Sequence, residues 1–147
     1  MSGGAKPLGK NVRRRKVQPV GILDASAIIA LIDKESGQHL VAEAMATGAG
    51  VCTANLAEVA AWLSRKRHPA DTIRRIITNL PLLVFDATQA LALEAGLLFS
   101  VTRAFGLSLG DRLCLALAAR ERQPVLTADR IWREAGPLIG VEVRLIR

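Results

Sequence analysis

A short apolar segment that ends abruptly in a carboxylate constrains the fold of this chain more than any other feature. Residues 19–23 are apolar or small, Asp24 follows, and an apolar run at helical spacing begins at once with Ala25. This order predicts a buried strand that ends at Asp24 and a helix just after it. Ligands of open α/β sheets bind outside the carboxyl ends of the strands, so we expect Asp24 to lie at a binding site.

Four further segments have the composition of strands, and amphipathic segments separate them. The expected strands cover residues 51–54, 82–85, 124–128 and 141–145, the last with the alternation of a half-exposed edge strand. The expected helices cover residues 25–33, 38–47, 56–67, 71–80, 87–103 and 109–122. Unbroken apolar strands that alternate with helices predict a parallel sheet covered on both faces. The expected fold class is α/β, with three α/β/α layers around a central, mainly parallel twisted sheet.

Polar residues that precede three of the helices are expected to cap them. Asn55, Asp86 and Ser108 stand where a side-chain oxygen accepts hydrogen bonds from the first free backbone N–H groups of a helix. Glu58 and Asp111 follow Asn55 and Ser108 by three residues, which is the spacing of a capping box. Both acids therefore have a purely structural explanation.

Length and charge describe a small basic protein. The 147 residues suit one domain with one core. The formal net charge is +7, from 20 Lys plus Arg against 13 Asp plus Glu, and it favours a polyanionic or acidic partner. The first 18 residues are rich in Lys, Arg and Gly, so we expect a disordered basic leader at 1–18 and the folded domain at 19–147. The leader is either a solvated tail or processing remnant, or an electrostatic arm for RNA.

Cysteine use and hydropathy indicate the compartment. Cys52 and Cys114 are single thiols inside apolar segments, so we expect two buried core residues and neither a disulfide nor a zinc site. A reducing, cytoplasmic location fits this pattern. No apolar run reaches the length of about 18 residues that a membrane span needs, and the N-terminus lacks the apolar core of a signal peptide.

Four carboxylates share one placement relative to the expected strands. Asp24 and Asp129 each follow a strand, whereas Glu58 and Asp111 lie in the first turns of helices. If the strands are parallel, all four acids lie at one end of the sheet. Each acid alone is explained as a helix cap. Together they indicate one site, because Glu58 lies off the apolar stripe of its helix and Asp24 follows a buried strand.

Four carboxylates at one site would repel one another, so they need a group that neutralises their charge. Two like charges about 4 Å apart repel by roughly 4 kcal/mol at an effective dielectric constant near 20. A helix N-terminus offsets only about 0.3–1 kcal/mol of this. A divalent cation neutralises more of this negative charge than a helix N-terminus does. Sites with only oxygen ligands favour Mg²⁺ or Mn²⁺ over zinc. These ions commonly contact phosphates, so the acids predict metal-assisted phosphate chemistry.

The residues around these acids resemble the PIN domain, and within it the VapC toxins of bacterial toxin–antitoxin pairs. The resemblance covers about residues 20–146 and rests on four motifs in order, Ile-Leu-Asp24-Ala-Ser26-Ala, Asn55-Leu-Ala-Glu58, Leu107-Ser108-Leu-Gly-Asp111 and Leu126-Thr127-Ala-Asp129. It implies a PIN domain at 19–147 and a metal-dependent ribonuclease. Asp24, Glu58, Asp111 and Asp129 would be catalytic and hold Mg²⁺ or Mn²⁺. Ser26 and Thr127 would support the carboxylates through their hydroxyls, with Ser108 and Asn55 as further supporting residues.

The resemblance also implies a reaction and partners. A metal-activated water would attack an RNA phosphodiester in line and leave a 5′-phosphate and a 3′-hydroxyl. A homodimer and a cognate VapB-like antitoxin that covers the groove are implied as well. Arg112 and Arg130, beside two of the acids, are candidate RNA phosphate contacts, with solvated helix positions as the alternative.

Two other functions remain open from the sequence. One is a PIN nuclease of RNA maturation, and the other is a non-catalytic PIN-fold binding module in which the acids serve as caps or as a docking surface. The chain has no Tyr, two Trp and three Phe, so platforms for base stacking are scarce. RNA contact is therefore expected through phosphates and shape.

Overall fold

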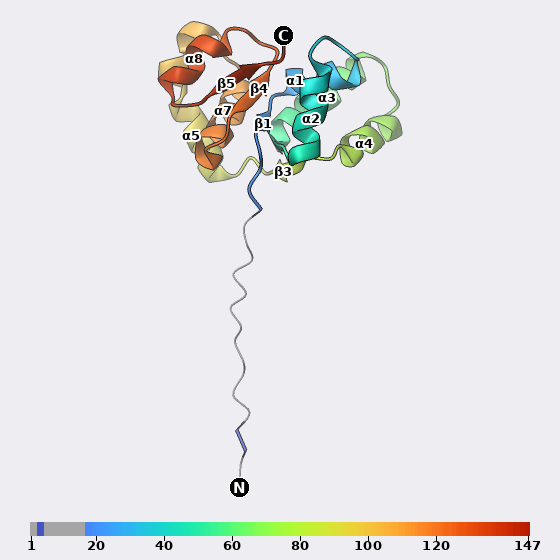
Figure 1. The fold of residues 1–147 in the computed structure, drawn as a ribbon, viewed down its shortest axis with the longest axis horizontal. Helices are drawn as coiled ribbons and strands as arrows, with labels where there is room; N and C mark the ends of the chain where they lie inside the picture. The colour runs from blue at the N-terminus through green and yellow to red at the C-terminus, as the bar shows by residue number, and fades with distance from the viewer. Residues whose placement is uncertain (1–2, 5–16) are drawn as a thin grey trace.

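The structure is a computed structural model, and it describes residues 3–4 and 17–147. The predicted disordered leader at residues 1–18 lies mostly outside the described residues. From Val17 the chain runs into the domain and reaches the middle of the sheet at its first strand (Figure 1).

Five strands form one parallel sheet in the order β3-β2-β1-β4-β5. They are β1 (Ile22–Leu23), β2 (Gly50–Cys52), β3 (Leu83–Phe85), β4 (Val125–Thr127) and β5 (Val143–Leu145). The inner strands β1, β2 and β4 are buried, whereas the edge strands β3 and β5 are partly exposed. The predicted parallel sheet is confirmed, and so is the half-exposed edge strand at the end of the chain.

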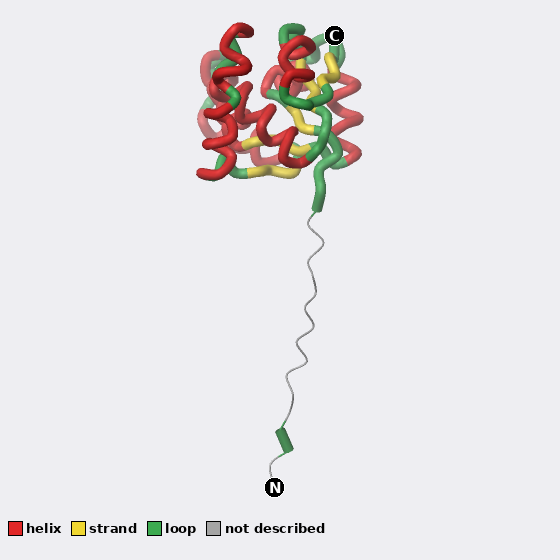
Figure 2. Tube along the Cα trace, turned by 90° about the vertical axis from the view of Figure 1, so that its left-hand side faces the viewer, coloured by secondary structure: helices red, strands yellow, loops and turns green. Residues whose placement is uncertain are grey.

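Helices cover both faces of this sheet, as Figures 1 and 2 show. They are α1 (Ala25–Ile32), α2 (Gln38–Thr47), α3 (Thr53–Arg65), α4 (Ala70–Asn79), α5 (Gln89–Leu97), α6 (Phe99–Thr102), α7 (Leu109–Glu121) and α8 (Trp132–Leu138). Ile22 packs into an apolar cluster with α5, α7 and α8, and its neighbour Leu23 packs into a second cluster with α1, α2 and α3. Successive strand residues point to opposite faces, so the two clusters lie on the two sides of the sheet. The predicted three-layer α/β/α architecture is confirmed.

The predicted cap at Asn55 is wrong. β2 ends at Cys52 and α3 begins at Thr53, so no loop residue separates the strand from the helix. Asn55 consequently lies inside the first turn of α3, fully buried, and Glu58 lies in the second turn rather than the first. The spacing of the two residues is not a capping box here, and the Asn55 side chain is free for another contact.

The single long helix predicted at residues 87–103 begins later in the structure and is divided into two helices. The chain stays irregular from Asp86 to Thr88, and the Thr88 hydroxyl accepts the Leu91 N–H at 3.2 Å. Thr88 rather than Asp86 therefore caps α5. α5 ends at Leu97, and after Leu98 the chain continues as the short helix α6 and a 3₁₀ turn.

The structure contains a helix that the sequence pattern did not predict, α8. Gly136 and Pro137 lie in its second half, and both residue types have low helix propensity. A Cβ atom at Gly136 would press against Val143 of β5, so the glycine lets α8 pack closely on the edge strand. Burial of Trp132 at the start of the helix adds apolar contact that outweighs the weak propensity.

No single helix in the described part of the chain is long and apolar enough to cross a membrane. One bent pair, Gln89–Phe105 with Leu109–Glu121, meets the requirement by length and composition.

Candidate active site at the carboxyl ends of the strands

Asp24 lies at the carboxyl end of the central strand and is held by two hydroxyl groups. Its side chain is nearly buried, and its Oδ2 accepts hydrogen bonds from Ser26 Oγ at 2.6 Å and Thr127 Oγ1 at 2.8 Å. The same hydroxyl oxygens accept the backbone N–H groups of Ala128 and Asp129, each at 3.0 Å. A hydroxyl that accepts a backbone N–H and gives its proton to a carboxylate has a fixed orientation. The network therefore ties β1 to the end of β4 and fixes the Asp24 carboxylate.

Glu58 approaches this site from α3. The buried Asn55 amide Nδ2 donates to Glu58 Oε1 at 3.0 Å and to the Gly110 carbonyl at 3.2 Å. Gly110 lies in the first turn of α7, and a Cβ atom there would run into the Glu58 carboxylate. Asn55 thus joins two helices through its hydrogen bonds to Glu58 and Gly110, and not through a helix cap; its role as a supporting residue of the site stays a prediction. The importance of Gly110 was missed, although a glycine inside a helical segment was its signal in the sequence.

Asp111 and Asp129 are each held by a backbone N–H group. Ser108 caps α7 in a complete capping box, in which Asp111 Oδ2 accepts the Ser108 N–H at 2.9 Å and Ser108 Oγ accepts the Asp111 N–H at 3.1 Å. The predicted cap is confirmed. Asp129 follows β4, and its Oδ1 accepts the Ile131 N–H at 3.1 Å in the turn before α8. Both acids therefore have one oxygen engaged by the backbone.

The four carboxylates act on one another electrostatically. Burial raises the pKa of Asp24, Glu58 and Asp111, and hydrogen bonds offset part of each increase. The charge of Asp111 further raises the pKa of Asp24, and both of these acids raise the pKa of Glu58. The charge of Asp129 raises the pKa of Asp111, while Arg112 lowers it. We call Asp24, Glu58, Asp111 and Asp129 the acid cluster, since each lies within the electrostatic field of another.

The donor atoms of the acid cluster suit a hard cation. They are carboxylate oxygens, which Mg²⁺ and Mn²⁺ prefer. The Cys114 thiol lies near three of these acids, but it is fully buried, and burial raises its pKa. Within the described residues, however, no three His, Cys, Asp or Glu side chains are arranged to hold one ion directly. Mg²⁺ typically takes one or two carboxylates and keeps several waters, so it does not need three acids to converge. The residues present therefore fit such an ion.

The two arginines that flank the acids differ in their surroundings. Arg112 turns toward α5, where its Nη1 donates to the Ala95 carbonyl at 3.3 Å and its guanidinium lies 5.3 Å from the centre of the Phe99 ring. Arg130 is exposed and follows Asp129 directly. Arg112 is half-buried and its Nε has no hydrogen-bond partner among the described residues, whereas Arg130 is exposed.

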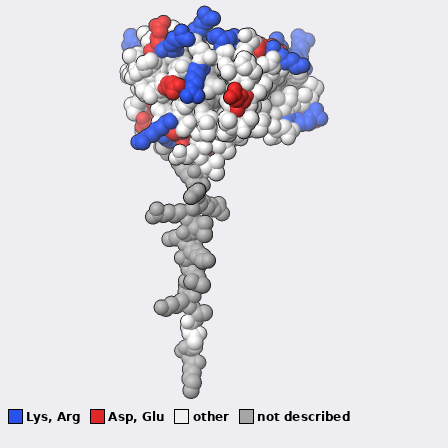
Figure 3. All heavy atoms as spheres, in the orientation of Figure 1, with Lys and Arg blue, Asp and Glu red and all other residues white. Residues whose placement is uncertain are grey.

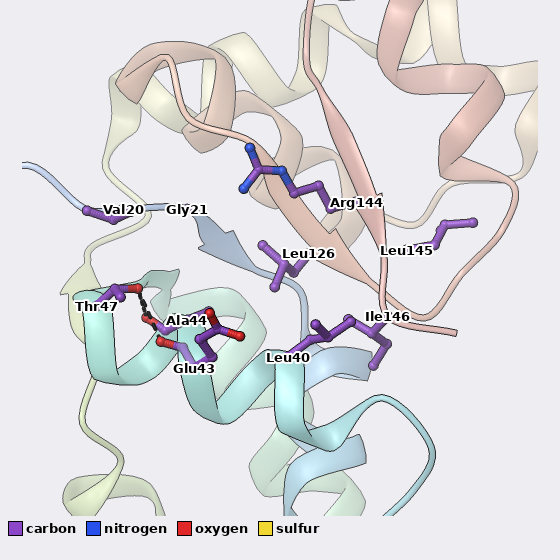
Figure 4. Close-up of a pocket in the computed structure, with 10 residues that line it drawn as sticks. All are labelled: Val20, Gly21, Leu40, Glu43, Ala44, Thr47, Leu126, Arg144, Leu145 and Ile146. Atoms are coloured by element: carbon purple, nitrogen blue, oxygen red, sulfur yellow. Dashed lines mark hydrogen bonds between the residues drawn. The ribbon is translucent and has the colours of Figure 1, made fainter.

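A separate apolar hollow of about 300 Å³ lies between α2 and the β4–β5 edge of the sheet. Figure 4 shows Leu40 of α2 facing Leu126 and Ile146 across it. No member of the acid cluster lines this hollow, so its lining contributes none of the oxygen ligands described above.

The sequence of this chain matches a family model, and its fold matches those of known proteins. The family model for the PIN domain matches residues 21–137. A toxin–antitoxin complex from Klebsiella pneumoniae is similar in fold, with a TM-score of 0.65 and 17% identity over 86% of this chain and 98% of that chain. DNA-bound VapBC from Salmonella typhimurium matches with a TM-score of 0.67 and 14% identity over 88% of this chain and 99% of that chain. VapBC2 from Rickettsia felis, bound to a DNA fragment of its promoter, has a TM-score of 0.62 and 16% identity over 86% and 98% of the two chains. No curated protein matches the chain by sequence.

Proposed function

The chain belongs to the PIN domain family, and from this premise we propose that it is a metal-dependent endoribonuclease of the VapC toxin type. PIN domains are generally nucleases, so phosphodiester hydrolysis is the activity class that the family supports. The observation that carries the proposal is the buried Asp24, which two hydroxyls orient while Asp111 acts on it electrostatically. The likeness in fold to proteins of toxin–antitoxin complexes supports the toxin role.

The side chains of this protein orient the acids before a substrate arrives. Two buried hydroxyl bonds hold Asp24, the capping box holds Asp111, and the Asn55 amide holds Glu58. An RNA phosphodiester is itself an anion, so an unneutralised acid cluster would repel it. Bound Mg²⁺ or Mn²⁺ supplies the positive charge and the activation of water that hydrolysis needs.

The test is RNA cleavage with and without a chelator. We expect the protein with Mg²⁺ or Mn²⁺ to cut total RNA at defined positions, with 5′-phosphate and 3′-hydroxyl ends by end-mapping, and EDTA to stop the reaction. Asp24→Asn should abolish cleavage, while Asp71→Asn, at an exposed acid on α4, should leave it unchanged. Cleavage by Asp24→Asn at the wild-type rate would refute the proposal.

A non-catalytic binding module is the second candidate, and two observations favour it. Asp111 is already used in a capping box, and no three acidic, His or Cys side chains among the described residues are arranged to ligate one ion. Calorimetry with Mn²⁺ separates the candidates. A nuclease should take up Mn²⁺ in a manner that depends on Asp24, Glu58 and Asp111, and a binding module should not.

Toxicity is tested in cells, because a maturation nuclease would carry the same acids. Induced expression of the wild type should arrest bacterial growth, and the Asp24→Asn protein should not. A small reading frame directly upstream, whose product binds the chain and relieves the arrest, would identify the VapB-like antitoxin. Cleavage without arrest would favour RNA maturation instead.

We also propose that the chain forms a homodimer through α5, α6 and the start of α7. Leu93, Leu97, Phe99, Val101 and Leu109 of this region are all exposed. α5 also buries Leu91 and Ala95 on its other side, and a helix that is apolar all round is normally covered on both faces. Light scattering should give twice the chain mass for the wild type and the single mass for Leu97→Glu, with Leu138→Glu as the control on α8.

A further inference from the structure

Three arginines line one hollow beside the acid cluster. Arg130, Arg133 and Arg147 surround a space of about 250 Å³ together with Leu145 of β5. Arg130 and Arg133 belong to the turn before α8 and to α8, whereas Arg147 follows β5. We call these three residues the arginine cluster. Figure 3 shows Lys and Arg side chains along the upper edge of the molecule, the edge at which Figure 1 places the C-terminus.

The charge of the arginine cluster is only partly neutralised by the protein. Arg147 Nη1 lies 2.7 Å from Glu35 Oε2, in the loop between α1 and α2, and thereby anchors one side of the hollow. Among the described residues, neither Arg130 nor Arg133 forms an ion pair or a side-chain hydrogen bond. Like charges that surround one concavity repel unless an anion lies between them. The hollow therefore favours an anion, and the guanidinium group pairs well with phosphate oxygens.

The position of the hollow relative to the acid cluster suggests which anion it takes. Arg130 follows Asp129 in sequence, and Leu145 is paired with Thr127, the residue whose hydroxyl holds Asp24. The two clusters thus adjoin at the carboxyl ends of β4 and β5. A polyanion that presents one phosphate to the acid cluster would bring a neighbouring phosphate over the arginines.

We infer that the arginine cluster binds the phosphate backbone of the RNA substrate next to the scissile bond. This inference rests on the proposed nuclease function and specifies where the strand lies. It assigns the contact to Arg130 and Arg133, with Arg147 held beside them by its ion pair with Glu35. Contacts to phosphates set affinity and register without reading the base sequence, which suits a chain poor in aromatic side chains.

The experiment measures RNA binding in EDTA, where cleavage is not required. The probe is a fluorescein-labelled single-stranded RNA of 20 nucleotides, and its anisotropy is followed at several KCl concentrations. Arg130→Gln/Arg133→Gln should lower the slope of log K against log salt by about 1.4, at about 0.7 per phosphate contact on a single strand. If the other contacts are unchanged, this slope corresponds to binding about 25-fold weaker at 0.1 M KCl.

Two matched variants make the result specific. Arg74→Gln/Arg75→Gln removes the same charge from α4, which Figure 1 shows on the opposite side of the molecule from α8, and should leave the slope unchanged. Arg130→Lys/Arg133→Lys keeps the charge and should keep most of the slope. Circular dichroism checks that each variant is folded, and Arg133→Gln alone replaces the double variant if that one fails to fold.

An equal slope for Arg130→Gln/Arg133→Gln and the α4 variant would overturn the inference. Failure of the inference can be told apart from failure of the proposed function, because RNA binding is measured without cleavage. RNA cleavage together with unchanged binding by Arg130→Gln/Arg133→Gln would refute the arginine cluster alone. RNA binding that depends on the arginine cluster, in a protein that does not cleave RNA, would refute the proposed nuclease function and leave the binding site in place.

Discussion

Replacement of Thr127 by valine tests the hydroxyl network that orients Asp24. Thr127 is fully buried, and valine has nearly its shape, so the change removes one hydroxyl and little packing. The lost group donates to Asp24 Oδ2 at 2.8 Å and accepts the Asp129 N–H at 3.0 Å. Asp129 is exposed, so water can accept its backbone N–H once the hydroxyl is gone. The Asp24 carboxylate is nearly buried, so water cannot replace the hydrogen bond that it loses.

The magnitude follows from the charge on Asp24. A hydrogen bond to an ionised group contributes about 1.5–3 kcal/mol, so we expect the free energy of unfolding to fall by that amount at pH values where Asp24 is ionised in both proteins. For a domain of this size the midpoint of thermal unfolding should fall by about 5–9 °C. The hydrogen bond also lowers the pKa of Asp24, so the variant should have a still higher pKa at this group. The destabilisation should therefore grow as pH rises through the native pKa of Asp24 and shrink when the carboxyl is protonated in both proteins.

Urea unfolding of metal-free protein between pH 4 and pH 8 measures this, with Thr102→Val as the control. Thr102 is equally buried, and its hydroxyl donates to the neutral Leu98 carbonyl at 2.7 Å. That carbonyl also accepts the Thr102 backbone N–H, so the control should lose about 0.5–1.5 kcal/mol at every pH. Equal, pH-independent losses in Thr127→Val and Thr102→Val would refute the reasoning. If the chain is a nuclease, Thr127→Val should also reduce activity by about 10- to 100-fold, as loss of support for a metal ligand does.

Three further predictions concern the acid cluster and the core. Burial and the charge of Asp111 raise the pKa of Asp24, so in urea unfolding the metal-free wild type should lose stability as pH rises from about 4 toward the native pKa of Asp24. Asp24→Asn cannot titrate at this position, so its free energy of unfolding should rise relative to that of the wild type over the same range. Gly110→Ala should displace the Glu58 carboxylate, so RNA cleavage should fall while the free energy of unfolding changes by less than about 1 kcal/mol. The control is Gly96→Ala, at a position with open space, which should keep activity and raise the melting temperature. Cys52 and Cys114 are fully buried, and burial raises the pKa of Cys114, so neither thiol should react with a thiol reagent until urea unfolds the chain.

The fold was predictable because its signals are local. Each inner strand is an apolar run of a few residues next to a helical pattern, and this repeated order specifies a parallel sheet without knowledge of any contact. Because parallel strands share a direction, the carboxylates that follow them fall at one edge of the sheet. The capping box at Ser108 and Asp111 was predictable for the same reason, since all of its atoms lie within four residues.

The predictions that failed depend on residues far apart in the chain. Asn55 has the sequence pattern of a cap, but α3 begins two residues earlier, and the Asn55 amide instead donates to the Gly110 carbonyl, 55 residues away. α8 forms against local propensity because Gly136 allows close contact with β5. The arginine cluster brings the end of the chain to the turn after β4, and no spacing in the sequence relates Arg147 to Arg130.

The two clusters of opposite charge lie side by side without neutralising each other. Arg130 is adjacent to Asp129 in the chain, yet among the described residues no member of the acid cluster forms a salt bridge with a Lys or Arg. Direct pairing would lower the pKa of the acids, whereas burial and mutual repulsion raise it for Asp24, Glu58 and Asp111. Arg112 acts on Asp111 electrostatically, but without a salt bridge to an arginine the acid cluster keeps most of its charge available to a ligand. We expect the acids to attract a cation and the arginines an anion, and the RNA substrate and metal ion that we propose would supply both.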